Sequence, residues 1–474
     1  FFFQAEDGIR DRSPSRGLGD VYKRQANEQA VLSYDATINA YLGFQLTTGT
    51  HLKEGLAADD NMPMLHILRG YFMKLFAVPA LEEKARQCHE ATGRAISACG
   101  SHKREQLHHQ ALGRWCDGDW QGANSAWEQI LLDHPTDVLA IRLAHFTHFY
   151  SGDARRMRDS AARVLPHWDT SIPGYGYIKG LYAFGLEESG DYQAAERWGR
   201  EAVDDNPSDI WATHAVTHVF EMQERHDEGI AWIDKLSKQW TGMNNFTFHV
   251  WWHRALFSLE KERYDEVLTL YDTQFRATQT EEYLDMTNAI AMLWRLENRG
   301  IDVGNRWEEL ADLSEPRTQG HLLYFADAHF IMALARGGRT EAIQEMLTSL
   351  RQAAQRDDTQ CQVIARVGVT LAEAIVSFHE GRFDAAFERL LPARYDVIAI
   401  GGSHAQRDLF SLVLTEAALR GNRATDARAL LAERIALKPK NPHTWRRYAD
   451  ALELAGDARA AKTARQQCST LLAA

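Results

Sequence analysis

The sequence predicts an all-α fold, a right-handed α-solenoid of stacked helix pairs. Turn signals recur along much of the chain at intervals of 34 to 40 residues, and each lies between two amphipathic stretches long enough to be helices. Alternating β-branched runs of the length that a sheet needs do not occur. The turn signals are Gly118-Asp119, Gly152-Asp153, Gly190-Asp191, His226-Asp227, Arg263-Tyr264, Gly381-Arg382, Gly421-Asn422 and Gly456-Asp457.

Two stretches, Trp120–Pro135 and Tyr192–Pro207, share one pattern. An aromatic residue is followed by Ala after three residues, by an apolar residue after seven more and by Pro after a further five. The small residue, Ala123 or Ala195, lets two helices approach closely, and Pro stops the chain from continuing as a helix. The pattern is typical of the second helix of a tetratricopeptide-type unit. We therefore expect both alanines to be buried where paired helices cross.

The first 25 residues are expected not to belong to the native protein. Gln4–Asp11 resembles the translation of a sequencing adapter, and Ser15–Gln25 resembles that of a transposase adapter end. No apolar run of signal-peptide length follows the charged residues. The native chain is expected to begin near Ala26.

From residue 26 to residue 100 the helix signals are less regular, and we expect an atypical helical N-terminal cap. Its clearest helices are Ser33–Thr47 and Leu65–Phe76. Residues 101–474 are predicted to form the tetratricopeptide-like repeat array. The period blurs between residues 268 and 338, where Glu281–Arg299 and His321–Arg336 are expected helices joined by a looser link.

Composition limits the partners and the compartment. The chain of 474 residues has a formal net charge of −12, which argues against nucleic acid and against an anionic membrane surface as partners. Its five cysteines are scattered without a Cys-x-x-Cys pair, which suits a reducing cytoplasm. The longest apolar runs are shorter than a helix needs to cross a bilayer. We expect a cytoplasmic protein with no nucleic-acid or membrane partner.

Histidines form the most notable polar pattern. Two pairs occur at i and i+4 spacing, so that each pair shares one helix face, and they lie in consecutive helices that should be the first helices of their units. In tetratricopeptide stacks the first helices line the concave wall, so the two pairs are expected to face one another in the groove. The pairs are His214 with His218, followed at i+7 by Glu221, and His249 with His253.

Three interpretations of the histidines stay open. They form a divalent metal site with Glu221 or another carboxylate, they bind a ligand or substrate, or they only hydrogen-bond one another in a half-buried wall. The spacing does not distinguish copper, zinc and iron.

Five further side chains are candidate ligand-binding residues. Trp252, next to the second pair, could stack on a flat ligand or could serve only as core. Asp327 and His329 are two residues apart, so on a helix at most one faces the groove. Arg407 is a candidate clamp for a carboxylate or phosphate with Asp408 orienting it, and the alternative is a buried ion pair between C-terminal repeats.

Five segments together resemble the tetratricopeptide repeat protein 38-like family, and the resemblance extends from about residue 28 to about residue 442. It implies a cytosolic helical-repeat protein and names no activity. The chain has His404 where the family pattern is expected to have Asn, which argues against essential proton chemistry at that position. The segments are Arg104–His108, Trp127–Asp137, Met157–Ser160, Tyr177–Tyr182 and Gly401–Asp408.

The sequence favours a binding scaffold whose His- and Trp-rich concave groove holds a peptide, a partner protein or a small molecule. The alternative is an enzyme that uses the groove histidines for acid–base or metal-assisted chemistry on a small molecule. The chain has no phosphate-binding loop, nucleophile elbow, His-Glu-x-x-His motif or dinucleotide fingerprint. An open groove would favour the scaffold, and a deep closed pocket would favour the enzyme.

Overall fold

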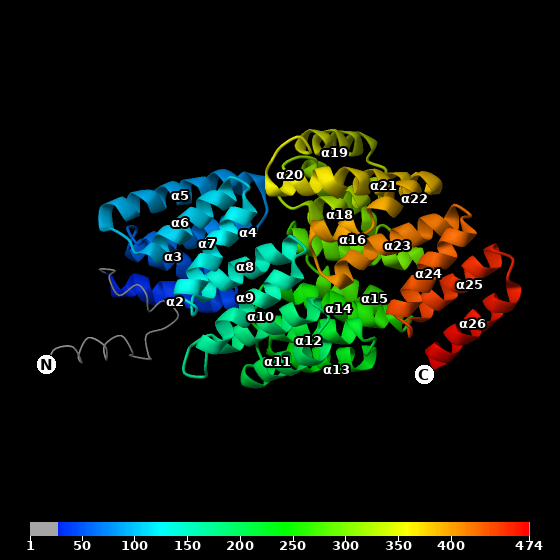
Figure 1. Cartoon of the computed structure of the whole chain (residues 1–474), viewed down its shortest axis with the longest axis horizontal. Helices are drawn as coiled ribbons and strands as arrows, with labels where there is room; N and C mark the ends of the chain where they lie inside the picture. The colour runs from blue at the N-terminus through cyan, green and yellow to red at the C-terminus, as the bar shows by residue number, and fades with distance from the viewer. Residues whose placement is uncertain (1–26, 474) are drawn as a thin grey trace. The chain divides into compact units, whose positions relative to one another are not determined.

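The computed structural model describes residues 27–473, and over that range the chain is an all-α solenoid of tetratricopeptide-like helix pairs (Figure 1). The one β-type contact within these residues is an isolated bridge between Gln45 and Met243. The predicted fold class is confirmed. The expectation that Phe1–Gln25 derives from an adapter concerns residues outside the described part.

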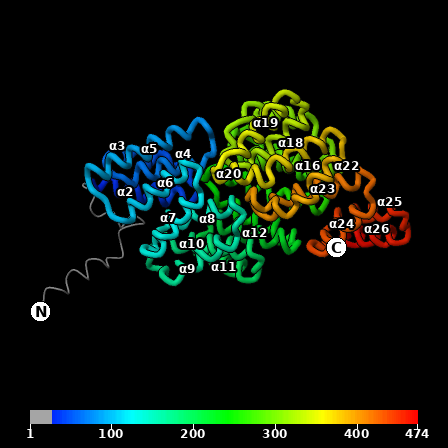
Figure 2. The backbone as a smooth tube through the Cα atoms, turned by 45° about the horizontal axis from the view of Figure 1, so that its top comes forward, coloured from blue at the N-terminus to red at the C-terminus, as the bar shows by residue number. Residues whose placement is uncertain are grey.

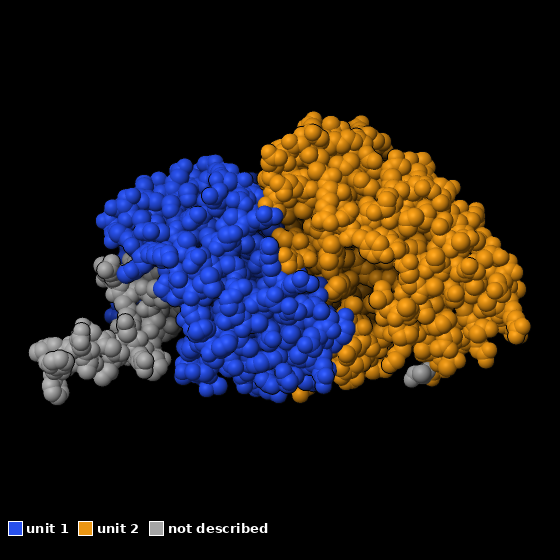
Figure 3. All heavy atoms as spheres, in the orientation of Figure 1, with its two compact units in different colours: residues 1–148, 154–215, 239–244 blue, residues 149–153, 216–238, 245–474 orange. Residues whose placement is uncertain are grey.

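The chain divides into two compact units, which Figure 3 distinguishes by colour. The first comprises residues up to 148 with residues 154–215 and 239–244. Its helices, with most of α8, are α2 (Glu28–Leu42), α3 (Thr48–Ala58), α4 (Pro63–Leu75), α5 (Pro79–Cys99), α6 (Lys103–Cys116), α7 (Trp120–Asp133), α8 (Val138–Tyr150), α9 (Ala154–Val164), α10 (Tyr175–Glu188) and α11 (Tyr192–Asp205).

The second unit comprises residues 149–153, 216–238 and 245–474. The boundary passes through α12 (Ile210–Met222), which is one continuous helix. The other helices are α13 (His226–Leu236), α14 (Phe246–Glu260), α15 (Tyr264–Leu270), α16 (Tyr283–Asn298), α17 (Arg306–Ser314), α18 (Tyr324–Arg336), α19 (Thr340–Ala353), α20 (Thr359–Val363), α21 (Val369–His379), α22 (Phe383–Ala393), α23 (His404–Arg420), α24 (Ala424–Leu437), α25 (Pro442–Leu454) and α26 (Ala458–Ala473).

Paired helices are joined by a short turn in which one residue has left-handed backbone geometry. The residue after it donates its N–H to a carbonyl five residues earlier, as Asp119 does to Arg114 and Arg263 to Ser258, both at 2.9 Å. This geometry suits Gly, which explains the periodic Gly signal in the sequence. From α6 onward the left-handed residues are Gly118, Gly152, Gly190, Glu224, Glu262, Gly300, Gly338, Gly381, Asn422 and Gly456.

The repeat period continues where the sequence pattern blurs. Gly300 and Gly338 occupy the turns after α16 and α18, at the same place in their pairs as Glu262 after α14. The expected looser link contains α17, a helix of nine residues. Before residue 100 the helices also pair, α2 with α3 and α4 with α5, and Phe44 and Ala77 take the left-handed position in their turns.

Ala123 and Ala195 are fully buried, in helices that pack against α6 and α10 respectively. Each belongs to the second helix of its pair, as the shared sequence pattern indicates. A side chain larger than a methyl group would have to displace the partner helix.

One helical stretch is longer and more apolar than the sequence reading allowed. Thr359–His379, formed by α20, a π-turn and α21, meets the length and composition of a membrane span, and 61% of its apolar window is buried inside the fold. The expectation that every apolar run is too short is therefore wrong. The reason is packing, because α21 is covered by α18 and α22 and so is apolar around most of its circumference.

Within the second unit, first helices from distant repeats lie side by side. α16 packs against α18 and α23, which lie beside it in Figure 2. It also packs against α14, and α18 packs against α21. A hydrogen bond of 3.0 Å from Arg295 of α16 to the carbonyl of Ala405 of α23 joins residues 110 apart in sequence. The core of this unit therefore consists largely of first helices.

Candidate metal centre

Two neighbouring first helices, α12 and α14, hold the four histidines. Both helices are apolar on most faces, and the histidines are almost inaccessible, with exposed fractions of 2% for His214, 0% for His218, 3% for His249 and 0% for His253. The i and i+4 spacing places each pair on one face of its helix. The histidines therefore lie in the packed interior rather than on an open groove wall.

The two pairs converge. Ring nitrogens of His218, His249 and His253 lie within 4.8 Å of one another, and His214, one turn earlier on α12, offers a fourth nitrogen within the same limit. The ring centroids of His218 and His253 are 4.4 Å apart, and those of His249 and His253 are 4.9 Å apart. The expectation that the pairs share one space agrees with this geometry.

Two neighbours fix the orientation of His249. Its Nδ1 lies 3.1 Å from Oδ1 of Asn288 on α16, which can accept a hydrogen bond from that nitrogen. The ring of Trp252 stacks on the other side, with centroids 5.5 Å apart and planes 15° apart. An Nδ1–H bonded to an amide oxygen leaves Nε2 with its lone pair, which is the atom a metal ion needs. Trp252 is itself fully buried and serves as a wall of the centre.

Burial keeps two of these imidazoles, His249 and His253, neutral. Burial, assisted by His218, lowers the pKa of His249 to about 3. Burial also holds the pKa of His253 well below its ordinary value, and His218, His249 and Arg295 add to the effect. A neutral imidazole is the form that binds a metal ion, so no proton has to be displaced at neutral pH.

A cluster of four imidazoles matches the needs of a tetrahedral transition-metal ion. Zinc–nitrogen bonds are about 2.0–2.1 Å, so ligand nitrogens around one ion lie roughly 3.3 Å apart. The four histidine nitrogens lie within 4.8 Å of one another, so small side-chain movements bring them to that spacing. Imidazole suits zinc, copper, nickel and iron, whereas calcium and magnesium prefer oxygen. The donor set therefore fits a borderline transition metal.

Glu221 stands apart from this cluster. It lies on α12 beyond His218, and its Oε1 forms an ion pair with Nζ of Lys438 at 3.5 Å. We predicted that Glu221 could complete the metal shell. Instead, its carboxylate pairs with Lys438 from the connection between α24 and α25.

Asp327 and His329 lie on α18 and point to different partners, as their spacing requires. Asp327 pairs with Nδ1 of His321 at 3.0 Å. Nδ1 of His329 donates to the carbonyl of Phe325 at 2.8 Å, and burial lowers the pKa of His329 to about 4. Neither residue belongs to the four-histidine cluster. His321 was missed because it precedes the helix and carries no periodic signal.

Arg407 and Asp408 do not act together. The Arg407 guanidinium donates to the carbonyl of Gly402 and lies 3.3 Å from Nδ1 of His404. Asp408 receives two hydrogen bonds from Arg434 of α24, at 2.5 and 2.7 Å. Burial raises the pKa of Asp408, but Arg434 and Lys438 more than offset it and hold that pKa far below its usual range. The contacts correspond to the alternative of a buried ion pair between repeats.

Arg295 is a neighbour of the centre that sequence reasoning missed. It is 4% exposed, and its guanidinium carbon lies 5.8 Å from the ring centroid of Trp252. Burial lowers its pKa to about 10, so it remains charged at neutral pH. It lies in an unremarkable helical pattern, and only the contact between α16 and α14 brings it to the centre.

No family model matches the chain. Among solved structures it is similar to the human IFIT1 dimer with m7Gppp-AAAA, at 14% identity over 95% of this chain and 96% of that chain, with a TM-score of 0.36. It is also similar to the TPR domain of P58(IPK), at 11% identity over 78% and 96% of the two chains with a TM-score of 0.22. The assignment of the repeat fold depends on the chain's own helix pairs.

Proposed function

We propose that this chain is a helical-repeat binding scaffold whose core holds one transition-metal ion at His214, His218, His249 and His253. The observation that supports the ion is the convergence of four buried imidazole nitrogens within 4.8 Å. Four protein ligands saturate a tetrahedral ion and leave no position for substrate, which is typical of a structural site. The ion would fasten α12 to α14 and so fix the relation of two consecutive repeats.

The alternative of acid–base catalysis by these histidines has weaker support. A general base works best when its pKa is near the working pH, and that of His249 lies at about 3. The side chains are also at most 3% exposed, which leaves a substrate little access. A structural ion requires neither a matched pKa nor an entry for substrate.

The surfaces of the repeats would then supply the binding function, with a peptide, a protein or a small molecule as partner. We also propose membership of the tetratricopeptide repeat protein 38-like family and a cytoplasmic location, the latter supported by five free cysteines. The absence of nucleic-acid and membrane partners stays a prediction from the net charge of −12.

Metal analysis of purified protein with matched variants tests this proposal. Wild-type protein should contain about one zinc, copper, nickel or iron per chain after dialysis, because four imidazoles bind such ions tightly. His218→Asn and His253→Asn should each lose that ion. His329→Asn removes an equally buried histidine outside the cluster and should retain it. Equal metal content in all four proteins, or none in wild type after zinc reconstitution, would contradict the proposal.

A further inference from the structure

Four glutamates lie together on the turns of two consecutive repeats in the second unit. Glu221 and Glu224 belong to the end of α12 and its turn, and Glu260 and Glu262 to the end of α14 and its turn. We call them the acidic turn surface. Glu221 is 5% exposed, and its second oxygen, like one oxygen of Glu224, is buried with no hydrogen-bond partner among the described residues.

Two of these glutamates occupy strained backbone positions. Glu224 has φ 56° and Glu262 has φ 55°, where the other turns from α6 onward have Gly or, once, Asn. Left-handed geometry is unfavourable for a residue with a side chain, so Gly would be the more stable choice for the turn itself. Strain of this kind points to a role of the side chain in binding.

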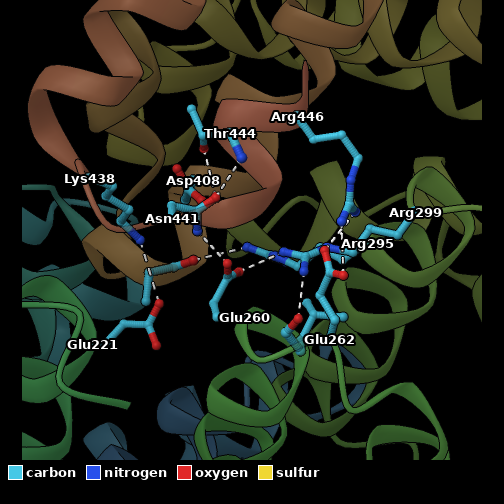
Figure 4. Close-up of polar contacts among 12 residues, drawn as sticks. Glu221, Glu260, Glu262, Arg295, Arg299, Asp408, Lys438, Asn441, Thr444 and Arg446 are labelled. Atoms are coloured by element: carbon cyan, nitrogen blue, oxygen red, sulfur yellow. Dashed lines mark hydrogen bonds and ion pairs between the residues drawn. The ribbon is translucent and has the colours of Figure 1, made fainter. Parts of the chain in front are cut away.

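The groups that meet this surface come from the short turn between α24 and α25 and from the first turns of α25 (Figure 4). Lys438 pairs with Glu221 at 3.5 Å, and the backbone N–H of Lys440 donates to Glu224 at 2.9 Å. The Asn441 amide donates to Glu260. Arg446 forms two contacts with Glu262, at 2.6 and 2.9 Å.

These contacts join parts of the chain that are far apart in sequence. The three hydrogen-bonded pairs are separated by 216, 181 and 184 residues. Further polar contacts link the same segment to α23 and α24, as Arg447 donates to Glu416 at 2.6 and 2.7 Å. Charge and hydrogen bonding therefore hold the segment in place.

The last helix pair has a hydrophobic core of its own. The four buried residues of this cluster all belong to α25 and α26. Three of them are alanines, Ala449, Ala461 and Ala464, which bury little apolar area. A terminal pair with a small separate core opens more readily than an internal pair, because it has one neighbour rather than two.

We propose that the acidic turn surface is a recognition site for a lysine-bearing turn followed by a helix start, and that the chain's own residues 438–446 occupy it as a latch. Release of the latch lets α25 and α26 move away as one hairpin and exposes the four glutamates. A peptide with the same basic sequence then competes for the surface. Closure strengthens at low ionic strength and weakens at high ionic strength, because partly exposed ion pairs are screened.

Hydrogen exchange by mass spectrometry on the full chain tests the latch. Glu262→Gly relieves backbone strain while removing the contact with Arg446, so the turn folds and the latch loosens. We expect amides of residues 442–473 to exchange about tenfold faster in this variant, and also in wild type at about 1 M salt, while α16 to α22 are unchanged. Asn422→Gly relieves the same strain in a turn outside the latch and should leave the hairpin unchanged.

A synthetic peptide of residues 436–447 supplies the second arm. In excess over wild-type protein it should speed exchange in α25 and α26 and slow exchange at residues 221–224 and 259–263. Equal hairpin exchange in Glu262→Gly, Asn422→Gly and wild type would overturn the latch. Faster hairpin exchange in Glu262→Gly without any effect of the peptide on wild-type protein would overturn recognition of a lysine-bearing segment by the surface.

Discussion

At the scale of single residues, the unusual feature is a set of histidines kept neutral by burial. Nothing in the spacing of His249 and His253 requires their depressed pKa values, because the same spacing on an exposed face would leave them near their ordinary range. The shift comes from the apolar faces of α12 and α14 that surround them. Neutrality prepares the imidazoles for a metal ion and also makes the fold sensitive to acid.

The acid sensitivity of the metal-free protein has a definite sign. A histidine with a depressed folded-state pKa contributes stability that is present above the unfolded pKa of about 6.5 and is lost as the pH falls toward the folded pKa, about 3 for His249. Between pH 7.5 and pH 5, His249 should lower the free energy of unfolding by about 2 kcal/mol, and His253 should lower it in the same direction. Urea unfolding with a chelator present measures this loss.

His249→Gln supplies the control for that prediction. The variant cannot gain a proton at position 249, so its loss of unfolding free energy between pH 7.5 and 5 should be about 2 kcal/mol smaller than that of wild type. If the two proteins lose the same free energy, His249 is not a buried neutral imidazole.

At the scale of helices, close contacts between consecutive pairs depend on small residues. A Cβ added at Gly229 of α13 would lie 2.3 Å from a ring carbon of Phe257, which is fully buried on α14. Gly229→Ala should therefore lower the free energy of unfolding by about 1–3 kcal/mol, although Ala is the better helix former. Chemical denaturation measures the change.

Gly93→Ala in α5 is the matched substitution. The nearest atom to its added methyl group is a ring carbon of His109 at 3.6 Å, which is an ordinary contact. The free energy of unfolding of this variant should rise by up to about 1 kcal/mol, because Ala has a higher helix propensity than Gly. If Gly93→Ala and Gly229→Ala raise the free energy of unfolding by similar amounts, α13 and α14 are less closely packed than described.

The helices also show what a sequence can predict. The period was visible because left-handed turns select Gly. It blurred between residues 268 and 338, although Gly300 and Gly338 occupy the turns there, because α15 is short and passes into a π-helical turn at Tyr271–Phe275. The meeting of the two histidine pairs followed from equal positions in consecutive repeats. By contrast, Arg434 as the partner of Asp408 depends on how α23 packs on α24, and local spacing does not determine that contact.

At the scale of the whole molecule, contacts between residues far apart in sequence are the features that the sequence pattern did not predict. The latch joins residues about two hundred positions apart, so no periodic pattern announces it. The position of Arg295 beside Trp252 likewise results from the packing of first helices in the second unit. In a repeat protein the sequence pattern of each unit is easy to recognise, because each unit mainly contacts its neighbours. Contacts between distant units leave no comparable pattern in the sequence.

We propose above that four imidazoles hold one metal ion between α12 and α14. X-ray absorption spectroscopy on the purified, metal-loaded chain tests it most directly, because the spectrum reports the type, number and distance of the ligands. The account predicts four nitrogen ligands at about 2.0–2.1 Å with the signature of imidazole rings. A shell dominated by oxygen or sulfur ligands, or one unchanged in His218→Asn and His253→Asn, would contradict it.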